Sequence, residues 1–129
     1  MALPDDDKVD LLVCDAVRQN IEGKFDIAGL YPTREVKIDP AATMPVNLNL
    51  TFVFVLKDGE GTFRAIHRII DPLGKELHKF DTPEFKKLPG QAHVMMLPVG
   101  LIPIVHAGNY VTSLEIDGRH YRRTVRVFQ

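Results

Sequence analysis

The stretch that decides the fold is Val46-Asn47-Leu48-Asn49-Leu50-Thr51-Phe52-Val53-Phe54-Val55-Leu56. Its even-numbered residues are all large and apolar, and its odd-numbered residues begin with two asparagines and a threonine. Successive side chains of a strand point to opposite faces, whereas a helix would spread these apolar residues around its circumference. The stretch therefore predicts a long strand that buries one of its two faces.

The C-terminal segment predicts a β-hairpin. Asp117-Gly118 is a preferred two-residue hairpin turn, because both central residues of that turn take a positive φ. The turn sets a register in which Leu114 lies opposite Tyr121 on an apolar face. Arg123 shares this apolar face. We interpret it as a rim residue whose stem is buried and whose charged head reaches water.

Turn signals recur along the rest of the chain, mostly 8 to 15 residues apart. Such spacing between short apolar segments is typical of all-β sandwiches and barrels. Gly108-Asn109-Tyr110 is similar to the tyrosine corner of immunoglobulin-like sandwiches, in which the tyrosine hydroxyl bonds to the backbone. The only helix candidate is residues 82–87, with Thr82 as N-cap. We predict an all-β fold, an antiparallel two-sheet immunoglobulin-like sandwich of about 7–9 strands.

Length and composition indicate one soluble domain. The chain has 129 residues, so we expect a single β-sandwich domain over residues 1–129, with residues 1–7 as a flexible N-terminal tail. Its 16 Lys and Arg residues are offset by 17 Asp and Glu residues, whereas nucleic-acid binders have a basic surplus. A single cysteine favours a reducing compartment, and the acidic N-terminus has the wrong sign for a signal peptide. We expect a cytoplasmic protein with no nucleic-acid or membrane partner.

Motifs for catalysis and for cofactor binding are missing from the sequence. It contains no P-loop, dinucleotide-binding, nucleophile-elbow or zinc-protease motif. The five histidines lack the spacing of a zinc site, and nothing in the sequence indicates a base that would activate Cys14. The sequence thus predicts no catalytic residue, no metal site and no cofactor, and it favours a protein that is not an enzyme.

Two polar groups are candidates for ligand binding. Asp15 and Arg18 follow the first predicted strand, where they could grip a polar ligand or could cap the turn and pair with each other. Four basic residues near the C-terminus could bind phosphate or carboxylate, because arginine forks match those anions. These residues are Arg119, His120, Arg122 and Arg126. A charged strand also protects a sheet edge from pairing with another chain, so both interpretations stay open.

Residues 94–105 form the most unusual segment, with nine large apolar residues among twelve. A half-buried strand needs apolar residues only at alternate positions, so we expect some of these side chains to be exposed. The segment is too short and too interrupted by prolines to span a membrane. It could plug the open end of a sandwich, or it could form an association surface. The candidate interface residues are Met95, Met96, Leu97, Val99, Leu101 and Ile102.

The first thirty residues carry a resemblance to a known family. Cys14-Asp15-Ala16-Val17-Arg18, followed by Gly23-Lys24 and by Ile27-Ala28-Gly29-Leu30-Tyr31, resembles the opening of a family of small bacterial proteins of unassigned function. The later segments Asp71-Pro72-Leu73-Gly74 and Ile116-Asp117-Gly118 are similar to that family as well. The resemblance covers nearly the whole chain. It implies an immunoglobulin-like sandwich and no particular activity.

The sequence therefore supports two functional hypotheses. The first is a non-enzymatic cytoplasmic binding or assembly module that associates with itself, or with a protein partner, through residues 94–105. The alternative is a small-ligand or anion-binding protein that uses the basic C-terminal strand or the corner at Asp15 and Arg18. A cleft that gathers the basic side chains would favour the alternative.

Overall fold

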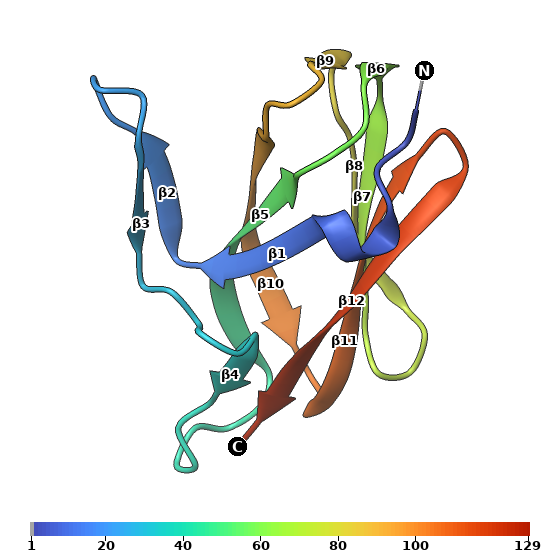
Figure 1. The fold of residues 1–129 in the computed structure, drawn as a ribbon. Coiled ribbons are helices and arrows are strands. Elements are labelled where there is room, and N and C mark those ends of the chain that lie inside the picture. Colours follow the sequence, from blue (N-terminus) through green and yellow to red (C-terminus); the bar gives the residue numbers. More distant parts are fainter. Residues whose placement is uncertain (1) are drawn as a thin grey trace.

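The computed structural model describes residues 2–129 and contains, in that range, twelve strands and one 3₁₀ turn, η1 (Asp6–Lys8) (Figure 1). The strands are β1 (Val9–Cys14), β2 (Ala16–Gln19), β3 (Phe25–Ala28), β4 (Glu35–Lys37), β5 (Val46–Leu56), β6 (Gly61–Phe63), β7 (Ala65–Ile70), β8 (Glu76–Asp81), β9 (Phe85–Lys87), β10 (His93–Ile104), β11 (Gly108–Ile116) and β12 (Arg119–Phe128). They form a three-stranded sheet in the order β1-β5-β10 and a five-stranded sheet in the order β4-β12-β11-β7-β8. Two further sheets are the pairs β2-β3 and β6-β9. The prediction of an all-β fold is confirmed.

The strand count exceeds the expected 7–9 because the chain contains several very short strands. Strands β4, β6 and β9 have only three residues each, and β2 and β3 have only four. The helix expected near residue 85 is instead strand β9, which pairs with β6. The Thr82 hydroxyl, expected to cap that helix, accepts a hydrogen bond from the Ala65 N–H at 3.0 Å. One pairing, of β4 with β12, is parallel and not antiparallel.

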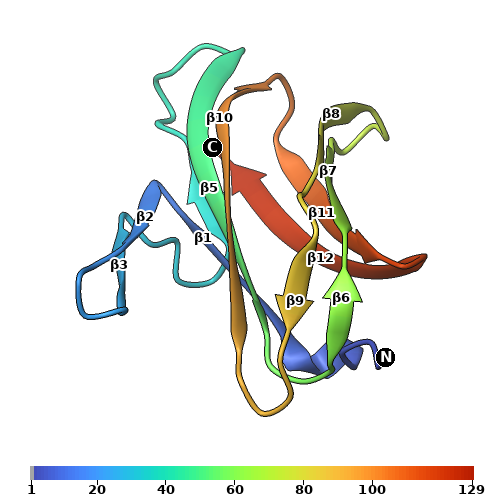
Figure 2. The ribbon, with the colours of Figure 1, turned by 90° about the horizontal axis from the view of Figure 1, so that it is seen from above.

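The two larger sheets share one hydrophobic core. Seen from above, β1, β5 and β10 lie on one side of the molecule, and β7, β11 and β12 lie on the other (Figure 2). Phe52 and Phe54 of β5 meet Leu114 of β11 and Tyr121 of β12 in this core, and none of the four is more than 2% exposed. The two phenylalanines occupy even positions of β5, which confirms the buried face that its alternation predicts.

The register of β11 and β12 is the one that their turn predicts. Leu114 lies opposite Tyr121, and the φ angles of Asp117 and Gly118 are 48° and 82°. At the other end of β11, the Tyr110 hydroxyl donates a hydrogen bond to the carbonyl oxygen four residues upstream, with an O–O distance of 2.6 Å. This is the bond expected of a tyrosine corner.

Residues 2–7 are anchored to the body of the protein, which differs from the flexible tail that the sequence suggested. The backbone of Ala2 exchanges two hydrogen bonds of 2.9 Å with Glu60. The carbonyl oxygen of Pro4 accepts a 2.6 Å hydrogen bond from the Tyr121 hydroxyl. Because Tyr121 is fully buried, its hydroxyl needs a partner, and the N-terminal segment supplies one. Met1, also part of the expected tail, lies outside the described residues.

Candidate functional site

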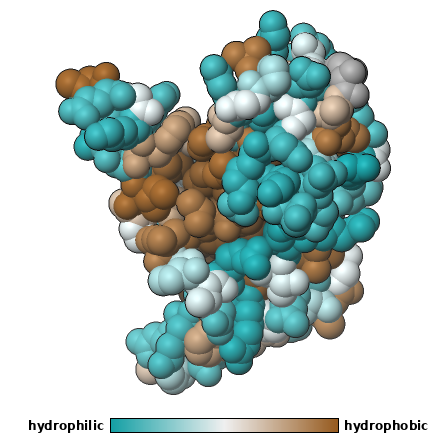
Figure 3. Space-filling view, in the orientation of Figure 1, coloured by the Kyte–Doolittle hydropathy of each residue, from teal (hydrophilic) through white to brown (hydrophobic). Residues whose placement is uncertain are grey.

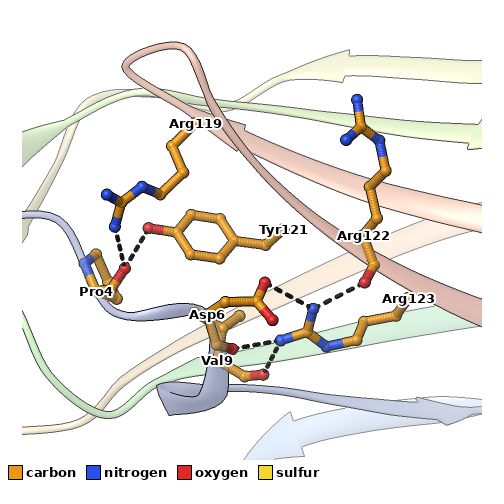
Figure 4. Close-up of polar contacts among 7 residues, drawn as sticks. All are labelled: Pro4, Asp6, Val9, Arg119, Tyr121, Arg122 and Arg123. Atoms are coloured by element: carbon orange, nitrogen blue, oxygen red, sulfur yellow. Dashed lines mark hydrogen bonds and ion pairs between the residues drawn. The ribbon is translucent and has the colours of Figure 1, made fainter.

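Two arginines of the basic C-terminal strand bind the N-terminal segment (Figure 4). Arg119 donates a 3.1 Å hydrogen bond to the carbonyl oxygen of Pro4. Arg123 donates to the backbone carbonyl oxygens of Asp6 and Val9 at 2.6 and 2.7 Å. The Arg123 side chain is only 15% exposed, and its guanidinium group bonds carbonyl groups instead of extending into water. Its role is structural, as expected, but it holds η1 and β1 in place and is not a solvated rim residue.

The other basic candidates point away from the core and do not meet at one place. The Arg126 guanidinium forms a 2.9 Å ion pair with Glu35 and lies 4.7 Å above the centre of the Phe128 ring. His120 lies 3.6 Å from the carboxylate of Glu115. Within residues 2–129, the Arg122 guanidinium makes no hydrogen bond or ion pair, and Figure 4 shows it directed away from the N-terminal segment. The structure therefore does not gather the predicted basic set into an anion-binding cleft.

A cleft of about 610 Å³ does lie near this strand, between η1, β1 and the segment before β4. Its lining includes three aspartates, at positions 6, 7 and 10, and only two arginines, Arg34 and Arg123. Since Arg123 is already bonded to backbone and to Asp6, the cleft has an acidic balance. Such a lining does not suit an anionic ligand.

The outer face of the five-stranded sheet is charged and internally paired. Arg68 of β7 bonds Glu115 of β11 at 2.7 Å and lies 3.2 Å from Glu76 of β8. The hydrogen bond from Arg68 holds the pKa of the Glu115 carboxyl below its ordinary value. His120 joins the same network through Glu115. We call these residues the charged outer face: Arg68, Glu76, Glu115 and His120.

Asp15 and Arg18 do not form the predicted corner. The Asp15 carboxylate accepts a 3.3 Å hydrogen bond from the Tyr31 hydroxyl, and it packs so closely on Gly29 that a Cβ there would lie 2.0 Å from its oxygen. Arg18 pairs instead with Asp26 across the β2–β3 hairpin, at 3.5 Å. The interpretation in which Asp15 pairs with Arg18 is wrong, because Asp15 accepts its hydrogen bond from Tyr31 and Arg18 pairs with Asp26. Asp15 anchors the root of the hairpin, and Arg18 lies on the hairpin itself.

Cys14, beside Asp15, is fully buried. Its thiol lies 3.7 Å from the carbonyl oxygen of Thr51. Burial, and next to it the charge of Asp15, raise the pKa of this thiol above its ordinary value. A thiol that stays protonated is a poor nucleophile, so Cys14 packs as a small apolar side chain.

The predicted interface on β10 divides into two sets. Met95, Leu97 and Ile102 are at most 7% exposed and belong to the core, so their assignment to an interface was wrong. Val99 is half-buried against the same core. Met96 and Leu101 are 38% and 69% exposed. The segment is an alternating strand, and only its outward half is available for contact.

Met96 belongs to an apolar surface that crosses the whole three-stranded sheet. Leu12 of β1, Val53 of β5 and Met96 of β10 lie side by side on its outward face. Val55 and Val94 form the next row. We call these five residues the apolar outer face. Figure 3 shows a hollowed hydrophobic area here, beside the projecting β2–β3 hairpin, whose Ile27 is 39% exposed.

Three members of this surface, at positions 12, 53 and 55, were missed from the sequence. The signal was present, because β1 and the second half of β5 are apolar on both parities. Apolar residues on both faces are typical of a central strand that is covered on both sides. The structure instead has β1 at the edge of its sheet. Apolar residues on both faces of β1 therefore indicate an apolar outer surface of the protein, and not a second core.

The described residues include no cluster of three or more His, Cys, Asp or Glu side chains that could hold a metal ion. No helix between residues 2 and 129 is long and apolar enough to cross a membrane. A family model matches residues 10–127, and its description is family of unknown function (DUF6941). No curated protein matches the chain.

Proposed function

We propose that the chain, which belongs to DUF6941, a family of unknown function, is a non-enzymatic cytoplasmic assembly module that binds a second copy of itself. We infer this role from its surfaces. We propose further that its two larger sheets form an immunoglobulin-like sandwich. The shared core of the two larger sheets and the hydrogen bond of Tyr110 support this architecture. The buried free cysteine is compatible with a reducing compartment.

The observation that carries the proposal is the row Leu12, Val53 and Met96. The outer face of an antiparallel sheet in contact with water is normally polar, with hydrophobic residues only on the inner face. Here three adjacent strands place an apolar side chain at the same level, and the next row adds Val55 and Val94. Contiguous apolar surfaces of this kind mark sites of protein association.

The charges around this surface favour a second copy over a strongly charged partner. Asp10 pairs with Lys57 at 3.0 Å at its border, and Arg18 pairs with Asp26 on the neighbouring hairpin. Each ion pair is closed within one chain. A neutral apolar surface meets its own copy across a two-fold axis without charge repulsion, as isologous dimers require.

The proposal is tested by sedimentation velocity at low micromolar concentration. The wild-type chain should sediment as a dimer or larger species. The double variant Met96→Asp/Leu101→Asp should be a folded monomer, because Met96 belongs to the apolar outer face and Leu101 is a further exposed apolar residue of β10. Leu73→Asp is the matched control, because Leu73 is a 74% exposed leucine in the turn between β7 and β8. A monomeric wild-type protein, or a double variant that unfolds, would refute self-association through this surface.

The anion-binding alternative has weaker support. Of the predicted basic residues, Arg119, Arg126 and His120 each have a partner within the chain, which leaves Arg122. A thermal shift on addition of phosphate would revive this alternative, provided that it disappears in Arg122→Ala.

A further inference from the structure

Strand β10 has a free edge with a defined bonding pattern. It borders only β5 in its sheet. On the other side of β5, the Lys57 N–H donates to the carbonyl oxygen of Lys8, so this opposed pair is hydrogen-bonded. Bonded and non-bonded pairs alternate along antiparallel strands. The N–H and C=O groups of Val94 and Met96 must therefore point away from β5.

The two prolines of β10 agree with this assignment. The backbone groups of Pro98 and Pro103 also point away from β5, so the missing N–H of each proline costs no hydrogen bond to β5. They protect the C-terminal half of the edge against pairing with another strand. The N-terminal half has no such protection, and residues 93–104 contain no Asp, Glu, Lys or Arg. The unprotected part of the edge is thus Val94 to Met96, and these two residues have no backbone partner on that side within residues 2–129.

A groove of about 290 Å³ lies along this part of the edge. Its walls include Phe80 and Phe85 as well as Met95 and Met96. Phe80 is 45% exposed, although it is one of the largest apolar side chains of the protein. Phe85 stacks on His93 with a centroid distance of 4.6 Å, which holds that wall of the groove in place. The groove therefore offers backbone hydrogen bonds along one side and aromatic surface along the other.

The charge at the groove is negative. Glu84 lines it, is exposed, and makes no ion pair with any described residue. Burial, together with the charge of Lys87, lowers the pKa of His93, so this histidine adds no positive charge at neutral pH. A basic side chain on the occupant would complement this carboxylate.

We propose that the Val94–Met96 edge binds an extended segment of a partner protein, which adds a strand to β10 and brings a basic residue to Glu84. The segment's backbone would pair with the free groups of Val94 and Met96. Its apolar side chains would contact Phe80 and Phe85. This site uses the free backbone groups of Val94 and Met96, whereas the proposed self-association uses the side chains of these two residues together with those of Leu12, Val53 and Val55.

The test is fluorescence anisotropy of the full chain with three labelled peptides. The first is Lys-Val-Thr-Val-Thr-Val-Lys, the second replaces both lysines with glutamate, and the third replaces the valines with proline. The lysine peptide should bind about tenfold more tightly than the glutamate peptide, and the proline peptide should not bind. Absence of binding by the lysine peptide up to about 1 mM, or equal binding of all three, would overturn the proposal.

Three variants locate the site. Met96→Pro removes one outward N–H in the way that Pro98 already does, and it should weaken the lysine peptide about tenfold. Met96→Thr keeps the N–H and shortens the side chain, so its affinity should change less. Glu84→Lys should reverse the charge preference, and it tests the site independently because this exposed change does not endanger folding. If Met96→Pro leaves the affinity for the lysine peptide unchanged, the peptide does not pair with this edge and the proposal is wrong.

Discussion

The outward faces of the two larger sheets obey the same alternation but differ in chemistry. On the five-stranded sheet, Arg68 links Glu76 and Glu115 in an ion-pair network. On the three-stranded sheet, Leu12, Val53 and Met96 form a row with no polar side chain. Both faces lie opposite the shared core. The difference shows that the alternation along each strand determines which residues point outward. The chemical nature of those outward residues then determines what the surface can bind.

Val53 illustrates the consequence. It points away from the core, yet it is only 2% exposed, and it lies between Leu12 of β1 and Met96 of β10. Ser113 occupies the comparable central position of the charged outer face and is 4% exposed. It lies opposite Arg122 on one side and Arg68 on the other. The two sites are similarly buried, but Val53 has apolar neighbours on the adjacent strands and Ser113 has arginine neighbours.

The largest effect is expected when a carboxylate is placed at these two sites. Val53→Asp should lower the free energy of unfolding by roughly 3–5 kcal/mol, because it buries a charge without a partner. Ser113→Asp should cost less than about 1 kcal/mol, because two arginines occupy the positions opposite residue 113 on the neighbouring strands. Urea denaturation of both variants measures the difference. Equal losses would mean that the two outward faces do not differ in the way described.

A smaller effect is expected from pH, and it separates the core from the charged outer face. Burial, and next to it His78, lower the pKa of His67 to about 3 from an ordinary 6.5. The unfolded chain therefore binds a proton below pH 6.5 that the folded chain does not bind until about pH 3. The contribution of the neutral His67 to stability is fully present above pH 6.5, and it is lost as the pH falls from 6.5 toward 3. The free energy of unfolding should be about 2 kcal/mol lower at pH 5 than at pH 7.

Urea titrations at pH 7 and pH 5 test this window. His67→Phe should abolish most of the difference. The charged outer face responds at lower pH, since the lowered pKa of Glu115 places the loss of its ion pairs below 4.5. A loss of stability between pH 7 and 5 that survives His67→Phe would assign it to another group.

Much of the fold could be predicted from local pattern. The period of two in β5 and the Asp117-Gly118 turn correctly predict a buried face and a register, because both depend on neighbouring residues only. The short strands β4, β6 and β9 could not be predicted, since three residues carry no periodicity and depend on distant partners. The anchoring of the N-terminal segment by Arg123 joins residues more than a hundred positions apart, and no local pattern encodes it.

Less of the candidate site could be predicted. Residues 94–105 were identified from excess apolarity, but apolarity alone does not distinguish Met95, which is buried, from Met96, which is exposed. That distinction depends on which residues of β10 face the core, and this follows from the pairing of β10 with β5. The bulge at Pro98 and Gly100 shifts the alternation by one residue, so that Ile102 faces inward and Leu101 outward. The contributions of Leu12 and Val53 require the strand order, which the sequence does not contain.

The smallest effect is expected from breaking the charged outer face. Arg68→Ala removes the shared partner of Glu76 and Glu115, but the network is partly exposed and such pairs contribute little. It should lower the melting temperature at low ionic strength, and by far less in about 1 M salt, where charges are screened within about 3 Å. Loss of Val53 packing should show no such salt dependence, because burial of apolar surface is not an electrostatic effect. Parallel melting curves of Arg68→Ala and Val53→Ala at the two salt concentrations make the comparison. If salt leaves the Arg68→Ala loss unchanged, then Arg68 acts through packing of its stem, and the two outward faces differ less than their charges suggest.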